Sequence, residues 1–93
     1  MFDIEDIRDE FPILKRNIYD KPLCYLDNGA SAQKPRAVLD MINKIYSSEY
    51  ANVHRGLHFL SNRATDHFEA VRGKIQKFLG AEFSDEIVFT SGT

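Results

Sequence analysis

The sequence predicts an α/β fold, because helical and strand-like patterns alternate along its 93 residues. Apolar side chains recur at helical spacing in two long segments, residues 35–49 and 62–79. Two short runs rich in β-forming residues, 23–26 and 86–90, stand apart from these helices. The second run leads directly into a Ser-Gly-Thr turn at 91–93. A chain of this length forms one domain at most.

The composition is typical of a folded protein without a nucleic-acid or membrane partner. A hydrophobic content of 43%, with seven Phe and four Tyr, argues against disorder. The net charge is −2 and the basic residues are scattered, which gives no basic patch for nucleic acid. There is no apolar run long enough to span a membrane and no basic, apolar start typical of a signal peptide. A single cysteine, Cys24, excludes an internal disulfide, so we expect a cytoplasmic protein.

Each predicted helix has its own start or stop signal. Asp3 is placed to cap a short first helix, which Pro12 should end at the preceding residue. Pro35 suits the first turn of the second helix. Ser61 is the expected N-cap of the third helix, and Gly80 is its expected C-terminal stop. The second helix is expected to bury one apolar face, made by Val38, Leu39, Ile42, Ile45, Tyr46 and Tyr50.

The run at 23–26 is predicted to be a strand, and small residues follow it. Within this strand Cys24 is interpreted as a small hydrophobic residue rather than a nucleophile. Gly29 and Ala30 lie in the turn after the strand, where small side chains allow a ligand or another segment to approach the backbone closely. A plain connector is the alternative interpretation of this turn.

The loop between the two long helices carries the richest chemistry of the chain. His54 is of the residue type that can exchange a proton near neutral pH, and Arg55 offers a planar fork of donors for a carboxylate or phosphate. Gly56 lets the backbone turn or approach a ligand. An ordinary surface loop is the alternative. We expect no metal site, because Gly56 separates His54 from His58 and a third ligand is not evident.

The turn at the end of the second strand-like run resembles half of a phosphate site. Ser91, Gly92 and Thr93 follow a β-rich run, as residues of phosphate-binding turns commonly do. The other half of such a site is the N-terminus of a helix that begins just afterwards. We therefore expect the chain to be the amino-terminal piece of a larger α/β protein.

Three stretches occur in a specific order: PLCYLDNGASAQKP at 22–35, NVHRGLHFLS at 52–61 and IVFTSGT at 87–93. Together they resemble the start of a SufS-like cysteine desulfurase, of the group II branch of the class V aminotransferase family. The VHRG core with the following Leu60-Ser61 is typical of that branch. The resemblance covers nearly the whole chain.

The resemblance implies a fold of type I among pyridoxal-phosphate enzymes, and a single partial domain over residues 1–93. Residues 1–60 would form an N-terminal arm and part of a small domain. Residues 61–93 would supply a helix and a strand that lead into the cofactor-binding domain. The implied parent enzyme is a homodimer.

The resemblance also implies an activity for the parent enzyme. It converts L-cysteine to L-alanine and passes the sulfur, as a persulfide, to an acceptor protein for iron–sulfur cluster assembly. Pyridoxal 5'-phosphate is the implied cofactor. The Schiff-base lysine and the nucleophilic cysteine would lie beyond residue 93, so the segment contains no catalytic residue. We expect the segment alone to be inactive and not to bind the cofactor.

Site residues are implied only where this sequence matches the family motifs. Gly92 and Thr93 fall on the turn that holds the cofactor phosphate. His54 and Arg55 fall on the loop beside the bound cysteine. Gly29 and Ala30 fall on the small-residue turn of the substrate side, although alanine is usual where this chain has Gly29. Cys24 does not match the catalytic cysteine.

Two other functions fit the same residues. One is a noncatalytic module that binds a desulfurase subunit or a sulfur-acceptor protein. The other is a segment of a related class V enzyme, such as a selenocysteine lyase. The downstream sequence would separate them, since continuation through a second threonine and a helix favours an enzyme segment.

Overall fold

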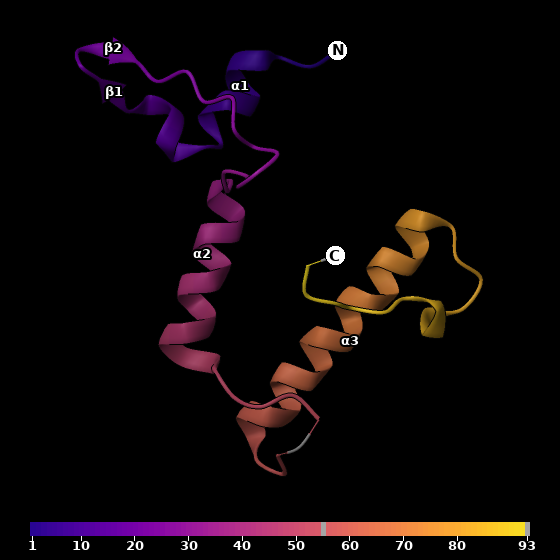
Figure 1. Ribbon diagram of the computed structural model, residues 1–93. Helices are drawn as coiled ribbons and strands as arrows, with labels where there is room; N and C mark the ends of the chain where they lie inside the picture. The colour runs from indigo at the N-terminus through magenta and orange to yellow at the C-terminus, as the bar shows by residue number, and fades with distance from the viewer. Residues whose placement is uncertain (55, 93) are drawn as a thin grey trace. The chain divides into compact units, whose positions relative to one another are not determined.

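The computed structural model describes residues 1–54 and 56–92. It divides into two compact units, Met1–Tyr46 and Ser47–Thr93. Figure 1 labels the main elements. In chain order the elements are α1 (Ile4–Asp9), η1 (Pro12–Lys15), β1 (Asn17–Ile18), β2 (Lys21–Pro22), α2 (Arg36–Lys44), η2 (Ile45–Glu49), α3 (Phe59–Leu79) and η3 (Ser84–Glu86). The subdivision of the chain after residue 60 stays a prediction.

The first unit begins with the predicted capped helix. The Asp3 carboxylate accepts hydrogen bonds from the backbone N–H groups of Glu5 and Asp6, at 2.9 and 3.4 Å. This confirms Asp3 as the N-cap, because its oxygen satisfies donors that have no partner inside the helix. α1 ends at Asp9, before Pro12 starts the short 3-10 helix η1.

β1 and β2 form a two-residue antiparallel hairpin, and the strand predicted at 23–26 is wrong. Asn17 pairs with Pro22 and Ile18 with Lys21 across a turn with positive φ at its two central residues. Such turns match the twist of paired strands. Leu23 still donates a hydrogen bond to the Arg16 carbonyl at 3.0 Å. None of the described residues forms a strand beside 24–26, so this run has no ladder and remains irregular.

α2 is the second predicted helix, and its last turn widens into the π-helix η2. Pro35 precedes the first helical residue, with φ −71°, as its N-cap. The expected burial of the apolar face is wrong. Val38 and Ile42 are 41% and 44% exposed, and Tyr46 is 70% exposed. Helical spacing aligned these side chains on one face, but burial needs a second surface to cover that face.

α3 is longer at its N-terminus than predicted. It begins at Phe59 rather than at residue 62, and His58 is the N-cap because its Nδ1 accepts from the Ser61 N–H at 3.3 Å. Ser61 therefore lies inside the first turn, where it is fully buried. Gly80 ends the helix with φ 72°, which confirms the predicted stop, since glycine adopts the left-handed conformation without strain. Among the described residues no helix is long and apolar enough to cross a membrane.

The chain returns from α3 through η3 and runs to the C-terminal turn without forming a strand. The strand predicted at 86–90 is therefore wrong in the structure as described. Its β-rich sequence has no neighbouring strand to pair with among the described residues, and a single run cannot make a ladder. The segment is nevertheless anchored, because Ile87 is buried at 8% exposure and its carbonyl accepts a hydrogen bond from Arg72.

Candidate functional site

A buried serine closes the loop that carries His54. The Ser61 hydroxyl donates to the Asn52 carbonyl at 2.6 Å and accepts from the Gly56 N–H at 3.0 Å. One side chain thus ties together both ends of the loop at the start of α3. Gly56 makes this possible, because a Cβ at that position would clash with the Cβ and Oγ of Ser61.

His54 stands in an unusual backbone conformation that α3 holds in place. Its φ is 67°, in the left-handed region that histidine adopts more readily than most residues. Its backbone N–H donates to Thr65 Oγ1 at 2.9 Å. Its ring meets Phe68 edge-on, with centroids 5.6 Å apart, and its Nε2 lies 2.9 Å from Glu69 Oε1. Left-handed residues persist where surrounding contacts determine them, as these three do.

Glu69 is held in turn by Arg72. The Arg72 Nε donates to Glu69 Oε2 at 2.9 Å, while another guanidinium nitrogen donates to the Ile87 carbonyl. The guanidinium also lies over the rings of Phe68 and Phe89, 5.4 and 5.0 Å from their centroids. The hydrogen bond from Arg72, with the nearby His54, holds the pKa of Glu69 below its ordinary value.

The segment that ends at Gly92 contains one residue in the left-handed backbone region. Gly92 has a φ of 70°, and no described atom lies within 4 Å of the position that a Cβ would occupy. Successive N–H groups in a turn with a left-handed residue can point toward one anion. The chain that leads to this turn begins at Ile87, whose carbonyl is held on α3 by a hydrogen bond from Arg72.

In the first unit, hydrogen bonds shape the small-residue turn around Gly29 and Ala30. The Asp27 carbonyl accepts from the N–H groups of Ala30 and Ser31, at 3.1 and 3.0 Å. The Tyr25 hydroxyl donates to the Ser31 carbonyl at 2.6 Å. No described atom lies within 4 Å of a Cβ built on Gly29, so the backbone is accessible there.

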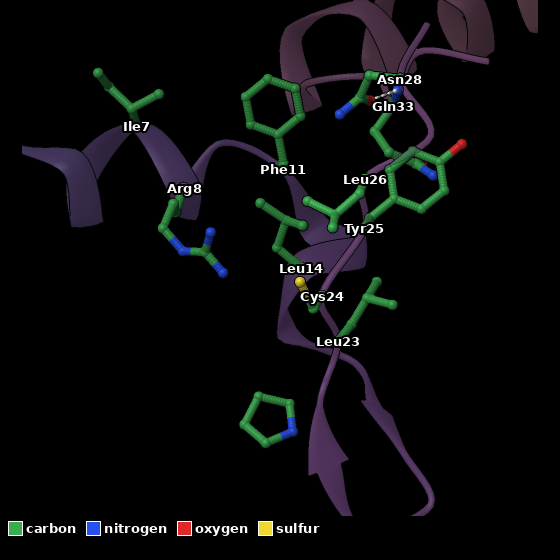
Figure 2. A pocket seen from close by; sticks show the side chains of 11 residues that line it. Ile7, Arg8, Phe11, Leu14, Leu23, Cys24, Tyr25, Leu26, Asn28 and Gln33 are labelled. Atoms are coloured by element: carbon green, nitrogen blue, oxygen red, sulfur yellow. Dashed lines mark hydrogen bonds between the residues drawn. The ribbon is translucent and has the colours of Figure 1, made fainter. Parts of the chain in front are cut away.

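A groove of about 520 Å³ lies beside this turn, and Figure 2 shows the side chains that line it. The Asn28 side chain accepts a hydrogen bond from the Gln33 N–H at 3.0 Å, which is drawn as a dashed line. Cys24 lies in the lining, is exposed and belongs to no strand, so its predicted place in a strand is wrong. Its interpretation as a small hydrophobic residue rather than a nucleophile stays a prediction. Ile7 of α1, Phe11 between α1 and η1, and Leu14 of η1 contribute apolar side chains to the lining.

A comparison with known families decides the relationship of this chain. Residues 24–93 match the model of the family described as aminotransferase class-V. The chain belongs to the aminotransferase class-V family.

Individual class-V relatives cover almost the whole chain. It is 51% identical over 92 residues to a cysteine desulfurase of Serratia proteamaculans, a match that covers 99% of this chain and 23% of that protein. It is 55% identical over 84 residues to a probable cysteine desulfurase of Synechocystis, covering 90% of this chain and 20% of that protein. The chain therefore spans about a quarter or less of the length of these relatives.

A solved cysteine desulfurase structure has a similar fold over this length. The apo structure of a cysteine desulfurase from Thermococcus onnurineus NA1 matches with a TM-score of 0.78 and 37% sequence identity. The match covers 97% of this chain and 21% of that chain. The predicted fold class is thus confirmed: the chain has the α/β fold of the N-terminal part of a cysteine desulfurase.

Of the class-V motif residues predicted for the site, four are described by the structure. His54 and Gly92 belong to the second unit, and Gly29 and Ala30 belong to the first. Arg55 and Thr93 lie outside the described residues. The assignment of all six to a substrate or cofactor site stays a prediction.

Sequence reasoning missed the residues of this class-V chain that hold His54. They occur on α3 at positions i, i+3, i+4 and i+7, and so share one face of the helix: Thr65, Phe68, Glu69 and Arg72. The spacing was a usable signal, because an acidic and a basic residue at i and i+3 form a pair on a helix face. What the sequence could not supply was the loop that folds back onto that face.

Proposed function

We propose that this chain is the N-terminal segment of a group II cysteine desulfurase that depends on pyridoxal phosphate. The full-length enzyme would convert L-cysteine to L-alanine and pass the sulfur to an acceptor protein for iron–sulfur assembly, in the cytoplasm and as a homodimer. The observation that carries the proposal is the 51% identity to a cysteine desulfurase over 99% of this chain. The VHRG loop motif supports the choice of branch.

The residues of the C-terminal turn fit the phosphate of the cofactor. Gly92 has a left-handed backbone, and no described atom lies within 4 Å of a Cβ built on it, which leaves room for an anion beside the turn. We assign the phosphate contacts to Gly92 and Thr93. Pyridoxal phosphate, when bound, would supply the electron sink that stabilises negative charge at the α-carbon of the substrate.

His54 and Arg55 are assigned to the substrate pocket. A carboxylate is the group that the Arg55 guanidinium would bind, and an imidazole can accept or donate a proton at neutral pH. Gly29 and Ala30 are assigned to the substrate side, where small side chains would leave room for the substrate.

The test uses the full-length protein loaded with pyridoxal phosphate, supplied with L-cysteine and a thiol reductant. We expect equal amounts of alanine and sulfide, and no product above that of free cofactor from the 93-residue segment alone. A parallel reaction with L-selenocysteine separates a desulfurase from a selenocysteine lyase. If the loaded full-length protein forms no alanine from cysteine, the proposal is wrong.

A further inference from the structure

Glu69 is a site residue that the family resemblance does not assign, and its contacts point to a role. We propose that Glu69, braced by Arg72, is a positioning residue that fixes the His54 ring with its Nε2 toward α3 and its Nδ1 available to the substrate. This inference rests on the proposed function, since it concerns the same substrate pocket. It adds residues of α3 to a site otherwise built from turns and loops.

His54 is held at its backbone and at its ring by the same helix face. Thr65 accepts the backbone N–H at 2.9 Å, which sets the left-handed φ of 67°. Phe68 meets the edge of the ring at an interplanar angle of 88°. Glu69 lies 2.9 Å from Nε2. Backbone, ring plane and one ring nitrogen of His54 are therefore each restrained by a contact with α3.

Arg72 gives the Glu69 carboxylate a fixed position. Its planar fork reaches Glu69 Oε2 with one nitrogen and the Ile87 carbonyl with another. The rings of Phe68 and Phe89 lie 5.4 and 5.0 Å from the guanidinium carbon, where cation–π attraction helps to hold the Arg72 side chain. A lysine could supply the charge at this position but not two donors in fixed directions.

The chemical consequence lies in the tautomer of the neutral imidazole. A carboxylate beside Nε2 favours the form with the proton on that nitrogen, because the carboxylate only accepts hydrogen bonds. The lone pair then resides on Nδ1, which can accept a hydrogen bond from the thiol or ammonium group of the substrate. The contacts from His54 to Glu69, from Glu69 to Arg72 and from Arg72 to the Ile87 carbonyl also connect the His54 loop to the segment that follows Ile87.

The test combines a spectroscopic and a kinetic measurement on the full-length protein. Nitrogen-15 spectra of labelled histidine report the tautomer of the neutral ring, and the His54→Asn variant identifies the signal of His54. We compare wild type with Glu69→Gln and Arg72→Lys. Asp66→Asn is the matched control, since it removes a carboxylate from the same helix without touching the contacts of His54.

We expect the His54 signals of wild type to show the proton on Nε2, and those of Glu69→Gln and Arg72→Lys to show mixed tautomers. Both variants should lower kcat by about 10- to 100-fold, with a smaller change in KM, because a misplaced group costs rate more than binding. Asp66→Asn should leave both measurements unchanged. Glu69→Asp, with the charge kept on a shorter side chain, should recover part of the tautomer preference and part of kcat.

An unchanged tautomer in Glu69→Gln would overturn the proposal, and so would a shifted tautomer with unchanged kcat. An Arg72→Lys variant with the tautomer and kcat of wild type would show that Arg72 acts through its charge alone, and this would also overturn the proposal. A wild-type protein that forms no alanine would contradict the proposed function but not the positioning role of Glu69. In that case the nitrogen-15 spectra would still decide whether Glu69 orients His54.

Discussion

Ser61 and Gly56 show how a single pair of residues sets the geometry of a functional loop. Ser61 is fully buried, and its hydroxyl satisfies a carbonyl and an N–H from two sides of the loop. Gly56 supplies the space that this contact needs. The sequence indicates that Gly56 lets the backbone turn or approach a ligand; the structure shows that its backbone lies against Ser61, and an approach to a ligand stays a prediction. The sequence analysis assigned Ser61 to the wrong capping role, because an N-cap and a first-turn serine have the same local sequence.

Ser61→Ala is expected to lower the free energy of unfolding by about 1–3 kcal/mol, because it leaves the Asn52 carbonyl and the Gly56 N–H without their partner. Denaturant unfolding of both proteins measures the difference. Ser31→Ala is the control, since Ser31 is exposed and takes part through its backbone carbonyl, which the substitution keeps. Equal effects of the two substitutions would contradict the role of the Ser61 hydroxyl.

Alanine at two glycines should have opposite effects. Gly56→Ala places a Cβ against Ser61, and overpacking of this kind destabilises by about 1–3 kcal/mol. Gly29→Ala meets open space at a residue without positive φ, so it should stabilise by about 0.4–1 kcal/mol through the unfolded state. Thermal unfolding of the two variants checks the signs. A stabilising Gly56→Ala would show that the loop does not close on Ser61.

At the scale of elements, α3 is the part of the second unit that organises the rest. One of its faces carries the contacts to His54, and the same face holds Ile87 through Arg72. The sequence predicted α3 and its glycine stop, because helical periodicity and capping are local properties. The sequence did not predict which residues contact this face of α3, since those residues come from separate parts of the chain.

Acidification should release the interactions of Glu69. Its pKa is lower in the folded protein than its ordinary value, mainly because Arg72 donates a hydrogen bond to it. A carboxylate with a lowered folded-state pKa stabilises the fold above the unfolded-state value, and this stabilisation is lost as the pH falls through the folded-state value. The difference in unfolding free energy between wild type and Glu69→Gln should therefore be present at pH 7 and shrink below about pH 4.

Denaturant unfolding of both proteins between pH 7 and pH 3 measures this difference. Asp66→Asn, on the same helix, serves as the control for the loss of one carboxylate. A gap between wild type and Glu69→Gln that stays constant across this range would show that Glu69 does not stabilise the fold as an anion.

At the scale of the whole molecule, most large apolar side chains of the described residues are exposed. Among the described residues only Ile87 and Ser61 are buried. Side chains of α2 predicted to form a buried stripe are exposed, including Val38 and Ile42. The relatives are four to five times as long as the match, so further chain in such proteins is available to cover these faces.

The 93-residue segment is expected to associate through these faces when it is produced alone, because contiguous exposed apolar side chains favour association in water. Light scattering and the binding of a hydrophobic dye measure this. A Val38→Gln, Ile42→Gln double variant should reduce both signals, whereas Arg36→Gln on the same helix should not. A segment that is monodisperse and binds no dye would contradict the expectation.

The sequence by itself determined the helices α1, α2 and α3, the Asp3 cap and the Gly80 stop, because each depends on residues that are near one another in the chain. It also determined the class-V family, through three motifs in a specific order along the chain. Tertiary structure decided what those elements contact. The runs at 23–26 and 86–90 did not become strands, since a ladder requires a partner that no local pattern supplies. The link from His54 through Glu69 and Arg72 to Ile87 depends on two segments folding back onto α3, and such long-range contacts leave no periodic signal in the sequence.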